Sequence, residues 1–327
     1  MTTFAPDSFG LPANRSWPQN LRHSRSAASV ILLVVLGVGL IVRDPAVLSG
    51  DAIGLLLSSA LPLVLVAMAQ QFVILAGDLD VGIGYSVGLA NVVSATVLVH
   101  NVFFGVLSLV AIVAGYVVMA LLIEAAKVPG IVITLGASFV WLGIGLMIQD
   151  TPGGTAPDWL TDSLGASLPG VPEPVYLVVA LAAFGYFVLR RSRWGAVLRA
   201  FGGSPSAFVR TGRSPWYARA TLYALAGVCV ALAGMMTTVV FSGSDINASQ
   251  TLTLTSIVAV IIGGGQFAGG IIEPVGTVVS SIGLALIPIL LVAFDLNTNY
   301  QPAVEGVILI LVMAARWLAR RESRARR

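Results

Sequence analysis

The sequence predicts an all-α, polytopic membrane protein with about ten transmembrane helices, and two properties of its composition predict this fold class. Of the 327 residues, 57% are hydrophobic and 10% are charged, whereas soluble domains carry about 25% charged residues. The hydrophobic residues also gather in runs close to the length of about 20 residues that crosses a bilayer as a helix. One helical bundle therefore explains the chain better than two soluble domains.

Ten apolar runs are separated by breaks rich in glycine, proline or aspartate, which end helices. The first run follows a polar tail, 1–26. It lacks a small-residue cleavage pattern after Val42, so we expect a retained span rather than a removed signal peptide. The runs form one transmembrane domain, 27–318, which a basic tail, 319–327, follows. The predicted spans are 27–42, 52–76, 81–99, 102–123, 128–148, 174–189, 217–241, 253–268, 274–294 and 302–318.

The lysines and arginines predict the orientation of the chain, because such residues near spans are retained on the cytoplasmic side. If the N-terminus is cytoplasmic, all 18 cations except Arg43 fall on that side. We therefore expect both termini in the cytoplasm. The outward loops carry acids instead, and the longest, 149–173, could form an external ledge. Because the cations flank spans and no soluble basic domain exists, no nucleic-acid partner is expected.

Two segments interrupt the helical pattern while their surroundings stay apolar, Ala76–Gly84 and Gly263–Gly270. Irregular backbone survives in a membrane where it lines a cavity or is buried in protein, and paired glycine-interrupted segments are typical of a transport pathway. We predict broken or re-entrant helices at both places. Residues 73–77 align loosely with residues 260–264, which hints at an ancient duplication.

Polar side chains near these breaks are the candidates for contact with a transported solute. Acids within a membrane are costly and usually functional, although Asp80 can also cap the helix that begins at Val81, and the two roles can coexist. Amides are expensive to leave unpaired, and hydroxyl groups in spans bond either a solute or a neighbouring helix. The predicted pathway residues are Gln71, Asp78, Asp80, Asn91, Thr134 and Ser138.

The sequence lacks the residues that several kinds of catalytic and binding chemistry need. The two histidines, His23 and His100, lie far apart, no nucleophile–base set is present, and no GxxxxGK[ST] phosphate loop occurs. We expect no catalytic residue, no metal site and no cofactor bound by this chain, so any ATP is used by a separate subunit. The single cysteine, Cys229, allows no intramolecular disulfide. Lysine, arginine and acids are missing from the middle of the spans, which places an ion-coupled carrier second to an ATP-driven system.

The segment 190–216 is too polar to span a membrane. It predicts two short helices broken at Gly202-Gly203, with Ser204 as N-cap and Pro205 at the first helical position. Apolar side chains among its charges suit docking onto a partner at the cytoplasmic face. The alternative is an amphipathic turn that rests on anionic headgroups.

Four blocks in fixed order carry a family resemblance: Gln71–Gly84, Val128–Gly136, Trp194–Gly212 and Ile257–Gly265 with Ala268–Gly270. With them, the chain resembles the permease subunits of bacterial ABC importers of the ribose/xylose/galactose type, which are distantly similar to branched-chain amino-acid permeases. The similarity runs through about 27–318.

The resemblance implies ATP-driven import of a small polar solute, above all a monosaccharide, by alternating access in the bacterial inner membrane. It implies cytoplasmic ATPase subunits, a periplasmic solute-binding protein and a second permease chain, identical or paralogous, within the lipid bilayer. It also implies that the segment matching 195–212 contacts the ATPase. The predicted coupling residues are Gly195, Arg199, Gly202, Gly203, Ala207, Arg210 and Gly212.

The chain departs from the family pattern at three acids. Asp78 is extra in the first block, Glu305 stands where a basic residue is common, and Glu273 follows the fourth block in place of a glycine-basic turn. These departures leave the solute open among pentoses, hexoses, nucleosides and other small polar molecules. The alternative functions are an ion-coupled secondary transporter and a non-transporting membrane scaffold or sensor.

Overall fold

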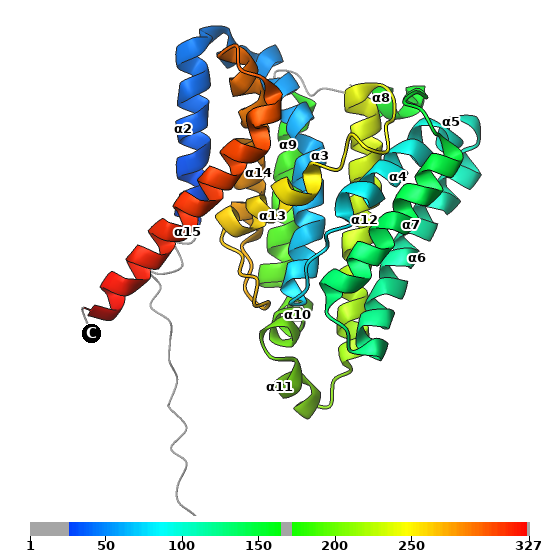
Figure 1. Cartoon of the computed structure of the whole chain (residues 1–327), viewed down its shortest axis with the longest axis vertical. Coiled ribbons are helices and arrows are strands. Elements are labelled where there is room, and N and C mark those ends of the chain that lie inside the picture. The colour runs from blue at the N-terminus through cyan, green and yellow to red at the C-terminus, as the bar shows by residue number, and fades with distance from the viewer. Residues whose placement is uncertain (1–25, 165–171, 326–327) are drawn as a thin grey trace, which may run out of the picture.

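The computed structural model describes residues 26–164 and 172–325, so the N-terminal tail and part of the 149–173 loop lie outside the described residues. The described chain is a bundle of helices (Figure 1), without a β-strand apart from one isolated bridge between Gly153 and Ser244. Every predicted span contains a helix. These helices are α2 (Ala27–Arg43), α3 (Gly50–Leu75), α4 (Ile83–Ala95) with α5 (Val97–His100), α6 (Val102–Ala126), α7 (Gly130–Ile148), α9 (Glu173–Gly185) with the π-helical turn η2 (Tyr186–Arg191), α12 (Pro215–Phe241), α13 (Leu252–Gly263), α14 (Pro274–Ala293) and α15 (Gln301–Ala325).

The all-α, polytopic class is confirmed. Within the described residues, eight helical stretches are long and apolar enough to cross a membrane, and α2 and α13 are shorter apolar helices of 17 and 12 residues. Ten crossings therefore stay a prediction. Two predicted ends differ: α13 stops at Gly263 rather than at 268, because the backbone turns at Gly264, and α15 continues to Ala325, beyond 318.

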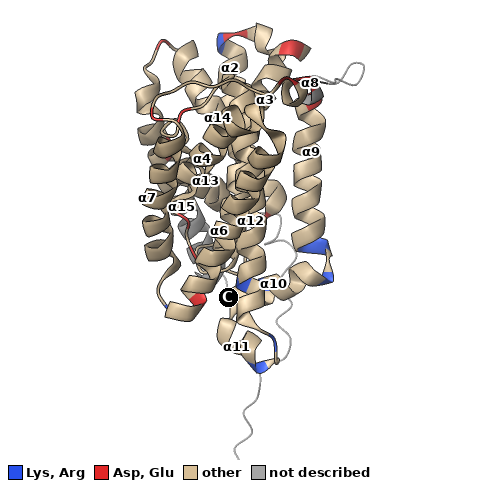
Figure 2. Cartoon of the chain, turned by 90° about the vertical axis from the view of Figure 1, so that its right-hand side faces the viewer, with Lys and Arg blue, Asp and Glu red and all other residues tan. Residues whose placement is uncertain are grey.

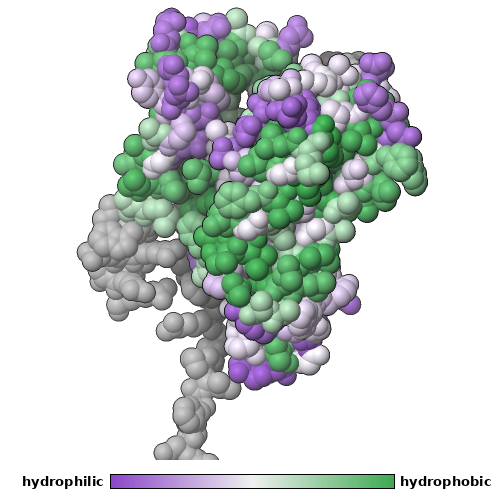
Figure 3. Space-filling model, turned by 45° about the vertical axis from the view of Figure 1, so that its right-hand side comes forward, coloured by the Kyte–Doolittle hydropathy of each residue, from purple (hydrophilic) through white to green (hydrophobic). Residues whose placement is uncertain are grey.

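Two helices form the centre of the bundle. α3 and α12 pack against each other, α6 and α4 pack on α12, and α13 and α14 pack on α3. Every α3 residue from Ala60 to Leu75 is buried. Around this centre, α6, α7 and α15 turn apolar side chains outward, including Phe103, Phe139 and Ile310, and Figure 3 shows a broad hydrophobic band between hydrophilic ends. An exposed apolar surface of this extent suits lipid.

Charge separates the two ends of the bundle. Lysine and arginine gather at the end that carries α10 (Arg193–Gly203) and α11 (Pro205–Arg210), and most acids lie at the opposite end, near α8 (Asp158–Leu164) (Figure 2). We call these the basic end and the acidic end. Arg43, the cation that the sequence places outside, pairs with Asp295 at 3.7 Å. The shorter 3₁₀ turns η1 (Pro45–Leu48) and η3 (Thr298–Tyr300) join helices at the acidic end.

Candidate functional site

The two predicted breaks end their helices in the same way. After α3, Gly77 N–H donates to Ile74 O and Asp78 N–H to Val73 O; after α13, Gly264 N–H donates to Ile261 O and Gly265 N–H to Val260 O. This pattern is the Schellman motif, which needs a left-handed residue just past the helix. The required φ angles are +87° at Gly77 and +117° at Gly264. The loose alignment of 73–77 with 260–264 therefore corresponds to one backbone geometry used twice.

The connector 76–82 leads back into the bundle, where the Asp80 carboxylate accepts two hydrogen bonds just before α4. Its Oδ1 accepts from Gly82 N–H at 2.8 Å and its Oδ2 accepts from the Tyr116 hydroxyl at 2.7 Å. The carboxylate is 1% exposed. The helix starts at Ile83, two residues later than expected, and its N-cap is Gly82, so Asp80 forms an Asx turn just before the helix in place of the predicted cap.

Thr134 and Ser138 of α7 hold the same connector. Thr134 Oγ1 accepts from Val81 N–H at 3.3 Å and donates to Leu79 O at 3.1 Å. A Cβ atom on Gly82 would lie 2.6 Å from Thr134 O and 3.0 Å from Ser138 Cβ. The close approach of α7 therefore fixes the path of the chain into α4.

Asp78 belongs to an ionic cluster at the basic end. Arg219, in the second turn of α12, pairs with Asp78 and donates to Glu124 Oε2 at 3.0 Å, while the Tyr223 hydroxyl donates to Asp78 Oδ2 at 3.1 Å. Lys127 pairs with Glu124 at 2.6 Å. The Arg219 guanidinium also lies 5.5 Å from the centre of the Phe201 ring, within cation–π range. The cluster ties the connector, α6, α12 and α10 together.

Three glycine-containing segments meet beside this cluster, and we call the contact of Leu75–Gly77, Gly202–Gly203 and Gly269–Gly270 the glycine junction. Gly270 N–H donates to Leu75 O at 3.1 Å. A Cβ atom on Gly202 would overlap Leu75 O, and one on Gly269 would lie 2.7 Å from Gly202 O. Because side chains are missing there, the backbone of α10 touches the start of the first break and the end of the second.

The segment 190–216 forms the two predicted helices, α10 and α11. Ser204 caps α11, accepting from Ala207 N–H at 3.3 Å, and Pro205 is its first residue. Ser192 caps α10 through Gly195 N–H at 2.8 Å, which sequence reasoning had not identified.

The predicted coupling residues divide into three groups by exposure. Gly195 and Gly202 are buried against this chain, with Gly195 beside the backbone of Val188 and Leu189. Arg199 and Ala207 are partly buried. Gly203, Arg210 and Gly212 are exposed, close in sequence to the exposed apolar side chains of Val209 and Trp216.

Gln71 and Asn91 lie at contacts between elements. Gln71 Oε1 accepts from the Thr277 hydroxyl of α14 at 2.7 Å, and its buried Nε2 has no partner among the described residues. Asn91 holds the loop after α12: its Nδ2 donates to Thr238 Oγ1 at 2.8 Å and to Gly243 O at 3.0 Å, and its Oδ1 accepts from Asp245 N–H at 3.1 Å. Contact of the six predicted pathway residues with a solute stays a prediction.

The other two acids that differ from the family pattern also have partners within the chain. Glu273 pairs with Arg190 at 2.5 Å, which joins η2 to the start of α14. Glu305 accepts from the Thr255 hydroxyl at 2.8 Å and from Gln301 Nε2 at 2.7 Å, which joins α15 to α13.

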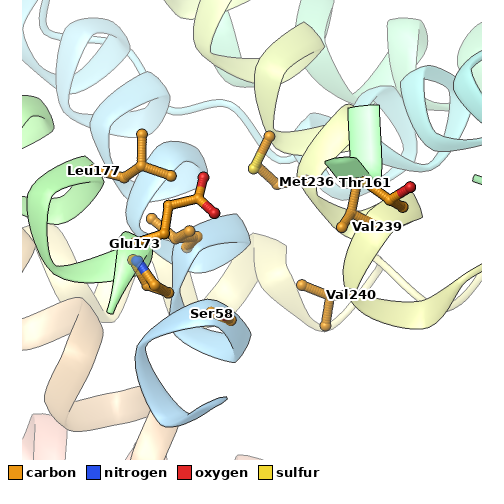
Figure 4. Close-up of a pocket in the computed structure, with 9 residues that line it drawn as sticks. Ser58, Thr161, Glu173, Leu177, Met236, Val239 and Val240 are labelled. Atoms are coloured by element: carbon orange, nitrogen blue, oxygen red, sulfur yellow. The ribbon is translucent and has the colours of Figure 1, made fainter. Parts of the chain in front are cut away.

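A cavity of about 140 Å³ opens near the acidic end, between α3, α8, α9 and α12 (Figure 4). Sequence reasoning missed it, and none of the six predicted pathway residues lines it. Its walls are mostly apolar and include one acid. The lining residues are Ser58, Leu61, Thr161, Glu173, Pro174, Leu177, Met236, Val239 and Val240.

Comparison with known proteins places these features in a family. Residues 52–313 match the family described as branched-chain amino acid transport system / permease component. The chain is 28% identical to the probable ABC transporter permease protein YphD of Escherichia coli, over 98% of this chain and 99% of the relative. It is 25% identical to the ribose import permease protein RbsC of Haemophilus influenzae, over 91% and 94%. It is 26% identical to the galactose/methyl galactoside import permease protein MglC of Escherichia coli, over 87% and 91%. No solved structure matches the chain significantly.

Proposed function

Because the chain belongs to the family of branched-chain amino acid transport system permease components, we propose that it is the membrane-spanning permease subunit of an ATP-driven importer for a monosaccharide. The match covers residues 52–313, which include both helix breaks, the glycine junction and α10. The observation that carries the proposal is the glycine junction, because it links a segment suited to docking with both irregular segments of the bundle.

The relatives support the class of solute. Those named for import of ribose or of galactose and methyl galactoside, and for transport of D-allose, are 25–26% identical to this chain. Two relatives named for import of autoinducer 2 are 26% and 23% identical, so the broader class is a small polar solute. The three acids that differ from the family pattern do not narrow the class of solute, since each has a partner within the chain.

The chain works with separate subunits that use ATP and deliver the solute. It is a transport subunit without ATPase activity of its own, and ATP is bound by a cytoplasmic ATPase that docks on the exposed side of α10 and α11, where Gly203, Arg210 and Gly212 lie. A periplasmic solute-binding protein docks at the acidic end, and a second permease chain, identical or paralogous, completes the pathway. In this arrangement the basic end and both termini are cytoplasmic.

Coupling runs from α10 into the bundle. A displacement of α10 shifts the end of α3 through Leu75 and Gly202, and shifts the α13–α14 connection through Gly269 and Gly270. Both connections re-enter the bundle, so their movement changes the relative stability of inward-open and outward-open states. Nucleotide drives the cycle only by the difference in its affinity for the two states.

The test is uptake of radiolabelled monosaccharides by proteoliposomes. The liposomes contain this chain with its ATPase, the binding protein is added outside, and ATP is enclosed or withheld. We expect uptake that needs ATP and both partners. Uptake by this chain alone, driven by an ion gradient, would instead indicate a secondary transporter. If the complex shows no uptake even when a paralogous permease chain is also present, the importer assignment is wrong.

A further inference from the structure

The cavity at the acidic end contains a carboxylate of which one buried oxygen atom accepts no hydrogen bond from the described residues. Glu173 is 6% exposed, and its Oε2 has no hydrogen-bond partner among the described residues. Figure 4 shows the carboxylate directed from α9 into the space that Met236 faces from α12. The Thr161 hydroxyl on the opposite wall donates to Asp158 O at 2.8 Å, so it does not satisfy Glu173.

A buried acceptor without a partner is costly, by more than an average hydrogen bond contributes. Such a group suits a ligand that brings the missing donors. The other walls are apolar, with Leu61, Leu177, Met236 and Val239 facing the same space. Apolar walls with one placed polar group are typical of small-molecule sites.

The cavity is also connected to the coupling machinery. Two of its walls are the acidic-end parts of α3 and α12. The opposite end of α3 is Leu75 in the glycine junction, and the opposite end of α12 carries Arg219 of the ionic cluster. A movement of α10 therefore acts on two helices that also form the cavity.

We propose that this cavity is an outer binding site for the transported solute, in which Glu173 accepts hydrogen bonds from solute hydroxyl groups. The inference rests on the proposed import function and names a part of its pathway. The C–H faces of the solute contact the leucine, valine and methionine walls, while the hydroxyl groups supply the donors that the carboxylate lacks. Glu173 thereby contributes to the choice of polyhydroxylated over apolar solutes.

The experiment uses the reconstituted complex with its ATPase and binding protein. It compares the wild type with Glu173→Met, which keeps an unbranched side chain and removes the acceptor. We expect solute uptake to fall about tenfold or more, the loss that follows from one hydrogen bond to a charged group. ATP hydrolysis stimulated by the binding protein, and the Kd of that protein for the complex, stay within twofold of the wild type. The matched control is Asp162→Asn, which removes an exposed acid from the same end; once uptake is corrected for any change in the Kd of the binding protein, this variant equals the wild type.

Solute analogues that lack one hydroxyl group separate binding from a structural role. The wild type discriminates against at least one such analogue, and Glu173→Met loses that discrimination. Thermal unfolding of Glu173→Met occurs at or above the wild-type temperature, because an unpaired buried carboxylate has been removed. Unchanged uptake and selectivity in an active complex would overturn the inference while leaving the importer function intact. A raised Kd of the binding protein would also overturn it, because Glu173 would then contact that protein. A wild-type complex that shows no uptake would overturn both the inference and the importer function.

Discussion

The acids that set this chain apart from its family pattern have become parts of local networks. Asp78 is matched by Arg219, Glu273 by Arg190, and Glu305 by two hydrogen-bond donors. A buried pair of opposite charges adds little net stability, but removing one partner leaves the other charge uncompensated. The networks are therefore sensitive to single substitutions.

Arg219→Met tests the largest of these networks. The variant leaves Asp78 without its cation, and we expect a loss of about 3 kcal/mol in the free energy of unfolding, measured by thermal unfolding in detergent. The double variant with Asp78→Asn recovers part of the loss, because the buried charge is removed. Arg213→Met, at an exposed position, changes stability by less than about 0.5 kcal/mol. Equal stability of both single variants would contradict the cluster.

Asn91 makes hydrogen bonds within the chain, and a substitution can show whether that structural role or contact with solute is its main role. Asn91→Ala removes three hydrogen bonds to α12 and the loop after it. We expect a loss of about 1–3 kcal/mol and faster amide hydrogen exchange around residues 243–245, with unchanged solute selectivity. Unchanged stability with altered selectivity would place Asn91 on the pathway instead.

At the scale of elements, α10 is held by backbone contact rather than by interlocking side chains. Gly202 lies against Leu75 O, whereas a Cβ atom on the adjacent Gly203 would have no other atom within 4 Å. The two neighbouring glycines therefore form a matched pair, of which one is required by packing and the other is not.

Gly202→Ala separates α10 from the glycine junction. We expect ATP-dependent uptake to fall at least tenfold, because Leu75 and α10 cannot keep their contact once a Cβ atom is present. The control is Gly143→Ala inside α7, where a Cβ atom would also have no other atom within 4 Å; it retains wild-type uptake and gains about 0.5–1 kcal/mol of helix stability. Uptake is measured in the same proteoliposomes, with protein amounts matched by gel filtration. If both variants keep wild-type uptake, α10 does not couple through this junction.

The whole molecule is organised by the separation of charge along the bundle. The basic end carries α10 and α11, and the acidic end carries α8 and the mouth of the Glu173 cavity. A membrane protein with this asymmetry keeps the basic end in the cytoplasm. The importer assignment requires the same orientation, because ATP is cytoplasmic and the solute arrives from outside.

Cysteine labelling measures this orientation. In a Cys229→Ala background, Asp158→Cys at the acidic end reacts with a membrane-impermeant maleimide on intact cells, whereas Arg210→Cys reacts only after the cells are permeabilised. The native Cys229 is buried, so we expect little labelling of the wild-type protein, which serves as the control. The reverse pattern of labelling would place the basic end outside and would contradict docking of an ATPase on α10.

The sequence alone determined the features that depend on short stretches of chain. Apolar runs gave the helices, glycines at 77 and 264 gave the two breaks, and Ser204 and Pro205 marked the start of α11. Caps, Schellman turns and apolar runs depend on residues that are close together in the chain, so their patterns can be recognised in the sequence.

The tertiary structure alone decided which distant residues meet. The glycine junction joins positions near 75, 202 and 270, the ionic cluster joins 78, 124 and 219, and the cavity joins α3, α8, α9 and α12. The spacing of residues along the chain does not specify which helices become neighbours, because many packings bury the same apolar faces. For that reason Glu173 reads in the sequence as one of several outward acids, and becomes a distinct site only when α9 and α12 enclose it.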